Sequence, residues 1–271
     1  MRDLSSVEFW PATGHRDEPW VVETEVDAWV KSSRRVCELY GEALQHVSLP
    51  SRVRGLRLMP GRGAGLDVLV DAFAAADFEG ARIEVPTSVR DLTPLVRARL
   101  VLDAIDLVLR ELAAVKGWPL EQVAEATRRV FESGLHFGWE GRTVTSRDRR
   151  RAARSRFWLT DGGLGRVQVE LLDRASGRVT QSSAALDAYS TVEGFARTSK
   201  SLRWLDTETL SLVNFSDAFG LFEETTVLDV HRDFQSHPRL SAQLRPQRTV
   251  VSTRTPVVVV PPPGRHRAGA R

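Results

Sequence analysis

The chain has 271 residues, 42% of them hydrophobic, which is enough to build a stable core without disulfides or metal ions. Its single cysteine, Cys37, excludes an intramolecular disulfide and a cysteine-based zinc site, and a buried free thiol is typical of a reducing cytoplasm. The net charge is only +3. The first 20 residues lack the apolar run of a secretory signal. Charged side chains interrupt the most apolar stretch, residues 95–115, so it cannot span a membrane. We therefore expect a cytoplasmic protein with no membrane-bound segment.

The charge is unevenly distributed along the chain. Residues 147–156 contain six arginines and one aspartate, and residues 239–271 contain seven arginines and no acid, so the rest of the chain carries a net charge of −9. Such segregation predicts basic patches on an acidic body, which suits either an anionic partner or pairing within the protein. Arginine outnumbers lysine by 35 to 3, a skew expected from a GC-rich genome, so arginine content alone does not indicate phosphate recognition.

The first predicted element, after an N-terminal arm over residues 1–23, is a helix that begins at Thr24. Thr24 can cap this helix, apolar residues recur at spacings of three and four up to Val47, and Pro50 ends it. A strand over 52–59, a helix over 66–76 and a strand over 81–85 follow. Together these three elements predict a parallel βαβ unit.

Two further helices are predicted between residues 93 and 133. Thr93 and Pro94 begin the first, whose wide apolar stripe runs to Val115 and favours a buried helix over a coiled-coil seam. Residues 117–119 break it, and residues 120–133 form a shorter antiparallel helix. Residues 24–135 are therefore expected to form a mainly helical α/β part that contains a buried helical hairpin.

From residue 136 onward, apolar residues recur at every second position. This alternation predicts an antiparallel β meander with strands near 137–144, 155–160, 166–172 and 178–184. The meander lies in a β-rich part over 136–247, which either shares one domain with the first part or forms its own. Residues 200–230 fit neither the helical nor the strand period. The tail over 248–271 is β-prone and rich in proline and arginine, and Pro256 permits an edge strand there. The predicted fold class is α+β.

The strongest candidate binding residues are six arginines, on the loop between the first two strands of the meander and at the start of the second strand: Arg147, Arg149, Arg150, Arg151, Arg154 and Arg156. Guanidinium groups bind carboxylates and phosphates through planar pairs of donors. The cluster therefore suits an acidic protein surface, a nucleic acid, or acidic residues of the chain itself. Phe157 and Trp158 follow it on opposite faces of a strand, so one of the two is expected in the core.

A second candidate is the glycine-rich connection that contains Gly61, Gly63 and Gly65, between the strand over 52–59 and the helix over 66–76. Backbone amides at a helix start can bind a nucleotide phosphate, and Glu84 in the next strand could bind a ribose. Leu66 replaces the third glycine of a dinucleotide-binding fingerprint, and no Lys-Ser or Lys-Thr pair follows. A flexible connection is therefore the favoured interpretation.

The remaining polar groupings do not predict catalysis or metal binding. Asp103 and Asp106 each have an arginine one helical turn away, which favours ion pairs over acid–base chemistry. His231, Asp233 and His237 are spaced so that neither a helix nor a strand brings both histidines to one metal ion. We expect no catalytic residue, metal or cofactor.

These observations favour a non-catalytic interaction or scaffold protein of the bacterial cytoplasm, which docks on a protein partner through the basic patch and the C-terminal tail. One alternative is a nucleic-acid-binding protein that uses the cluster over 147–156. Another is a nucleotide-binding enzyme or sensor that uses the loop over 61–65. The sequence leaves the oligomeric state open.

Overall fold

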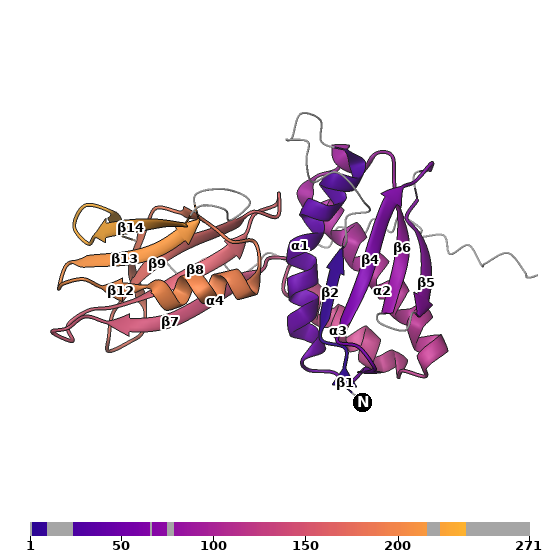
Figure 1. The fold of residues 1–271 in the computed structure, drawn as a ribbon, viewed down its shortest axis with the longest axis horizontal. Helices are drawn as coiled ribbons and strands as arrows, with labels where there is room; N and C mark the ends of the chain where they lie inside the picture. Colours follow the sequence, from indigo (N-terminus) through magenta and orange to yellow (C-terminus); the bar gives the residue numbers. More distant parts are fainter. Residues whose placement is uncertain (1, 10–23, 66, 75–78, 216–222, 237–271) are drawn as a thin grey trace, which may run out of the picture.

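The computed structural model describes residues 2–9, 24–65, 67–74, 79–215 and 223–236. Figure 1 shows two layered parts beside each other, a first part over residues 2–135 and a second part over residues 136–236. The first part has a four-stranded sheet with three helices, and the second has antiparallel sheets with one helix. The chain therefore has an α+β fold, as the sequence predicts.

The sheet of the first part has the strand order β2-β4-β6-β5. Its strands are β2 (Ser6–Phe9), β4 (Gly55–Arg62), β5 (Leu69–Ala74) and β6 (Glu79–Val85), and a separate short pair joins β1 (Arg2–Asp3) to β3 (Pro50–Ser51). Strands β2, β4 and β6 are parallel, whereas β5 runs antiparallel to β6. Alternate residues of β4 and β6, such as Leu58 and Ile83, are buried, so one face of this sheet supplies the core.

Helix α1 (Glu25–Leu44) joins β2 to β4 and packs on both strands. The Thr24 hydroxyl accepts a hydrogen bond from the Asp27 amide, and the Asp27 carboxylate accepts one from the Thr24 amide, which forms a capping box. Trp29 and Tyr40 on its inner face are fully buried. The predicted helix is confirmed, and with two parallel strands it forms a βαβ unit.

The βαβ unit predicted over residues 52–85 has its two parallel strands, which are β4 and β6, but its predicted helix is wrong. Residues 66–76 were expected to form its helix, but Leu69–Ala74 form strand β5, which pairs with β6. In this segment Val70 and Ala72 pack against the core, so the alternation of a strand prevails over the helical propensity of its alanines. Residues 1–23 were expected to be an arm that precedes the first element, but Ser6–Phe9 form β2, whose Phe9 ring packs edge-on against Trp29.

The helical hairpin is confirmed. It consists of α2 (Pro94–Lys116) and α3 (Leu120–Glu132), preceded by the short 3₁₀ helix η1 (Val89–Asp91). The Thr93 hydroxyl caps α2, and Gly117, with φ of 71°, ends it in the left-handed conformation that favours glycine. The apolar stripe of α2 is buried against α1, α3 and β5, as expected for a core helix. None of the described helices is long and apolar enough to cross a bilayer.

The second part contains the predicted antiparallel meander. Its main sheet has the order β15-β10-β9-β8-β7, and β11 also pairs with β9. The strands are β7 (Gly138–Thr145), β8 (Ala152–Leu159), β9 (Gly165–Leu172), β10 (Val179–Ser183), β11 (Leu186–Ala188) and β15 (Phe234–Ser236). Strand β8 begins three residues earlier than expected, so Arg154 and Arg156 lie well inside it.

The ambiguous region over 200–230 becomes part of a second sheet. Helix α4 (Val192–Ser201) is followed by β12 (Arg203–Trp204), β13 (Thr209–Phe215) and β14 (Glu223–Asp229), in the order β12-β13-β14. Helix α4 contacts β7 and β13, and Figure 1 shows it lying alongside the strands of this part. Stacked rings of Phe137, Phe195 and Phe157 tie the helix to β8, so Phe157, and not its neighbour Trp158, belongs to the core.

The two parts meet where α1 faces the β8–β9 turn and the start of α4. The Arg34 guanidinium donates to the Gly163 carbonyl at 3.1 Å, and the buried Arg35 guanidinium contacts both Asp161 and the Pro94 carbonyl. Burial raises the pKa of Glu38, and the backbone amide of Val192 at the start of α4 partly offsets this rise. Charged groups from one face of α1 therefore make a polar joint, and the apolar residues beside it belong to one continuous cluster.

Candidate functional site

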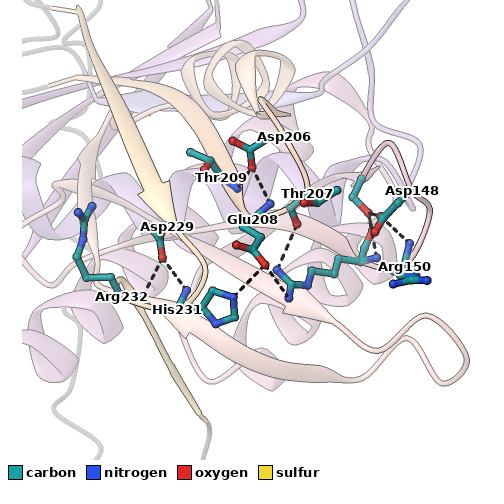
Figure 2. A network of polar contacts seen from close by, with 11 residues as sticks. Asp148, Arg150, Asp206, Thr207, Glu208, Thr209, Asp229, His231 and Arg232 are labelled. Carbon is teal, nitrogen blue, oxygen red and sulfur yellow. Dashed lines mark hydrogen bonds and ion pairs between the residues drawn. The ribbon is translucent and has the colours of Figure 1, made fainter.

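Four of the six clustered arginines lie on the turn between β7 and β8, and two lie on β8. The Ser146 amide donates to the Arg151 carbonyl at 2.9 Å, which closes the turn. Asp148 accepts from the Ser146 hydroxyl at 2.6 Å and from the Arg150 amide at 3.0 Å, and these two bonds hold the pKa of its carboxyl below the usual value. Figure 2 shows Asp148 beside Arg150. The turn is therefore a defined structure that places its arginine side chains outside.

Three arginines of the cluster bind acidic residues of the protein itself. Arg154 donates from Nε to Glu170 at 2.7 Å and from another nitrogen to Glu140 at 2.6 Å. Arg156 lies 3.5 Å from the other oxygen of Glu170, a carboxylate that is only 2% exposed. Arg154 and Glu170 are directly opposite each other on β8 and β9, so the register of the strands brings them together.

Arg151 is the third of these arginines. It donates to the Thr207 carbonyl at 3.2 Å and lies 4.0 Å from the Glu208 carboxylate. Glu208 also lies 3.3 Å from the His231 ring, as Figure 2 shows. Arg151, Arg154 and Arg156 therefore hold strands and turns together, which was one of the alternatives left open by the sequence.

The other three arginines, Arg147, Arg149 and Arg150, point into solvent. All three are exposed, and their guanidinium groups make no hydrogen bond or ion pair with any residue that the structure describes. Arg149 has a φ of 59°, and its carbonyl accepts from the Arg174 side chain of the β9–β10 turn. The predicted cluster thus consists of three arginines that bind other residues of the protein and three arginines that are exposed.

Four turns gather around the exposed arginines at one end of the second part. We call this surface the loop end; it comprises residues 146–151, 173–178, 205–208 and 229–233. Contacts between the turns define it: Arg174 reaches Arg149, Arg151 reaches Thr207, and the Val230 amide donates to the Glu208 carbonyl at 2.9 Å. Its sequence contains no Phe, Tyr or Trp, and its one ring side chain is that of His231. The apolar Leu205 is exposed there.

The aspartates of the loop end are occupied by their own turns. Asp206 accepts from the amides of residues 208 and 209, each at 2.7 Å, and Asp229 accepts from those of residues 231 and 232. The side chain of Arg232, with the Asp229 amide, lowers the pKa of Asp233 to about 2. The pKa values of Asp206 and Asp233 are lowered, so these two carboxylates stay ionised at neutral pH while they shape the turns. The guanidinium groups of Arg147, Arg149 and Arg150 make no hydrogen bond or ion pair with the loop-end aspartates.

The glycine-rich connection does not precede a helix. Gly61 lies within β4, and the chain passes through Gly63 and Gly65 toward strand β5. The Gly63 amide donates to the Val85 carbonyl at 3.0 Å, and a Cβ on Gly63 would lie 2.8 Å from that oxygen. Glu84 is exposed on β6, opposite Leu69 of β5. Gly63 therefore lets the connection pass close over the end of β6, and the described residues that follow it, 67–74, contain no helix start that would receive a phosphate.

The remaining polar candidates have structural partners. Arg99 binds Asp103 at 3.1 Å and Arg110 binds Asp106 at 2.7 Å, the predicted pairs one turn apart on α2. Residue 237 lies outside the described residues, and those that are described contain no group of three or more His, Cys, Asp or Glu side chains placed to hold a metal ion. Cys37 is buried as expected.

Comparison of the chain with protein-family models, curated proteins and solved structures gives no match. The chemistry of the loop end therefore carries the functional argument. Sequence reasoning located the arginines, but it missed that three neighbouring turns also contribute, over residues 173–178, 205–208 and 229–233. For one of these turns the sequence does contain a signal, the Asp-x-x-Ser pattern of residues 173–176, in which the Asp173 carboxylate accepts hydrogen bonds from Ser176.

Proposed function

We propose that the protein is a non-catalytic interaction protein of the bacterial cytoplasm and that its loop end binds an acidic surface of a partner protein. The observation that supports this is the division of the arginine cluster. Arg151, Arg154 and Arg156 are bound internally, while Arg147, Arg149 and Arg150 stand on a hydrogen-bonded turn with exposed guanidinium groups. A rigid turn loses little conformational entropy when its side chains bind, so it is well suited to present charge to a partner.

Three features favour an acidic protein surface over nucleic acid. The loop end has no Phe, Tyr or Trp side chain on which a base can stack, and its one ring, that of His231, lies 3.3 Å from the Glu208 carboxylate. Ionised aspartates lie between the arginines, and they would repel a continuous phosphate backbone. The exposed Leu205 gives the surface an apolar contact of the kind that protein interfaces bury. The predicted contribution of the tail over 248–271 lies outside the described residues.

The test is a charge reversal of the exposed half of the cluster. A tagged chain carrying Arg147→Glu, Arg149→Glu and Arg150→Glu is compared with the parent in co-purification, with bound proteins quantified by mass spectrometry. We expect recovery of an acidic partner to fall by at least about tenfold, because each reversed charge repels the surface that the arginine attracted. The matched control reverses three exposed arginines of the first part, Arg2, Arg52 and Arg62, and should retain the partner.

Two results would contradict this function. One is equal recovery of the partner by the two triple variants. The other is that purified parent protein binds DNA or RNA at physiological salt, with an affinity that falls steeply as salt increases and that the cluster variant loses. The second result would assign the exposed arginines to nucleic acid, which is the alternative function.

A further inference from the structure

The edges of the sheets differ in how they are protected against pairing with another strand. The outer edge of β5 is covered by α2, because the Ala72 amide donates to Glu111 at 3.2 Å. The edge strand β7 contains a bulge between Glu140 and Thr143, and the Arg142 amide there donates to the Ser199 hydroxyl. The edge strands β2 and β15 have only four and three residues. Bulges, covers and short length are the usual devices that block strand addition.

Strand β14 has none of these devices. It is seven residues long, pairs with β13 in an unbroken register, and pairs with no described residue along its other edge. It contains neither proline nor lysine, and its Val227 side chain is 49% exposed. Figure 1 shows β14 at the margin of the second part. A long, regular edge with an exposed apolar residue is a template for one more strand.

An acidic cavity lies beside this edge. It has a volume of about 410 Å³ and is lined by Ala185, Leu186, Asp187, Asn214, Glu224 and Thr226. Asn214 is only 4% exposed; its carbonyl oxygen accepts from the Thr226 hydroxyl at 2.6 Å, while its amide nitrogen has no hydrogen bond to a described residue. The Asp187 carboxylate of β11 already binds the Arg166 guanidinium, so the Glu224 carboxylate of β14 is the group on the cavity wall that suits a guanidinium entering from an added strand.

The chain itself supplies a segment with the matching properties. Residues 248–260 (RTVVSTRTPVVVV) are rich in β-branched residues and contain Arg248 and Arg254 but no acid. These two arginines are six residues apart, so in a strand they project from the same face. Eleven residues separate this segment from the end of β15 at Ser236, and an extended chain of that length reaches roughly 36 Å.

We propose that residues 248–260 of the same chain add to β14 as a further strand and place an arginine in the acidic cavity. The added strand satisfies the unpaired amides and carbonyls of β14 and covers Val227. An arginine on its inner face meets Glu224. Pro256 fits this arrangement because the added strand becomes the new edge, where the missing N–H faces solvent.

Thiol cross-linking in the full chain tests whether residues 248–260 pair with β14 and which side chains of this segment lie on the same face as Val227. Val227→Cys is combined, one at a time, with a cysteine at each position from 249 to 255; the native Cys37 is buried and does not compete. If Arg248 and Arg254 face the cavity, odd-numbered positions lie on the side of Val227. We expect an intramolecular disulfide at odd positions near Val227, with yields roughly fivefold above those of their even neighbours. The control replaces Val227→Cys by Val115→Cys, an exposed residue at the end of α2.

The cross-linking overturns the proposal if yields do not alternate, or if Val115→Cys gives the same yields as Val227→Cys. A covalent dimer would assign the strand to a second copy and would also overturn docking within one chain. Hydrogen exchange provides an independent measure. Arg248→Glu with Arg254→Glu should speed exchange of β14 amides by roughly five- to tenfold, while Arg265→Glu with Arg267→Glu in the same tail should not. Equal exchange in the two variants would contradict the proposal.

Discussion

Replacing Arg154 by alanine separates the structural arginines of the cluster from the exposed ones. The Glu170 carboxylate is 2% exposed, and its close partner is Arg154, itself 21% exposed, at 2.7 Å. The second partner, Arg156, is 57% exposed and 3.5 Å away, so it compensates poorly. Removing one partner of a fully buried pair costs about 3–5 kcal/mol. Because Arg156 stays and Arg154 is partly hydrated, we expect Arg154→Ala to lower the free energy of unfolding by about 2–3 kcal/mol.

The assay is urea unfolding at neutral pH, followed by tryptophan fluorescence. Arg156→Ala should cost at most about 1 kcal/mol, as for other exposed ion pairs, and Arg150→Ala should change stability by less than about 0.5 kcal/mol. The double replacement of Arg154 and Glu170 by methionine should recover most of the loss, because no unpaired charge is then buried. The reasoning is refuted if Arg154→Ala is no more destabilising than Arg150→Ala.

Three further outcomes follow from single sites. Gly163→Ala should lower the free energy of unfolding in urea by about 2–4 kcal/mol, because Gly163 has a φ of 70° and an added Cβ would overlap the α1 backbone. The control is Gly177→Ala, which should cost only about 1 kcal/mol because Gly177 has a φ of 67° but open space around it. Arg232 lowers the pKa of Asp233 from 3.8 to about 2. The ionised Asp233 side chain therefore contributes its full stabilisation above about pH 4 and loses it as the pH falls toward 2. In Asp233→Asn, the urea midpoint should depend less on pH in this acid range. Burial raises the pKa of the Cys37 thiol, so a disulfide reagent should modify it only after unfolding; rapid reaction of the native protein would contradict its buried position.

Helices proved predictable because their signals are local. The Thr24 and Thr93 caps and the apolar stripes place α1 and α2 to within a residue or two of their starts. Strand β5 was missed because its six residues fit both periods, and only the neighbouring β6 decides between them. Strand β13 was missed because Ser211 and Asn214 are buried, which removes the contrast between its two faces.

The sequence predicts where the arginine cluster lies, but not which of its arginines are exposed. Arginines were expected on the turn between two strands and at the start of the second strand; four lie on the turn, and Arg154 and Arg156 lie inside β8 because that strand begins at Ala152. The sequence does not show which of them are bound internally, since Arg154 and Arg156 meet a glutamate that lies on the next strand. That pairing depends on strand register, which is set by the whole buried face and not by the residues of the cluster.

The polar joint between α1 and the β8–β9 turn bears on whether either part can exist as a fragment. Arg35 lies 126 residues before Asp161 in the chain, and its side chain is almost fully buried. A fragment that ends near residue 135 would keep this guanidinium and its Pro94 contact but lose the carboxylate, and a fragment that starts there would expose Gly163 and the Val192 amide. Each fragment would thus carry half of a complementary set of charges and amides, so the two should recognise each other when mixed and separate as salt is added.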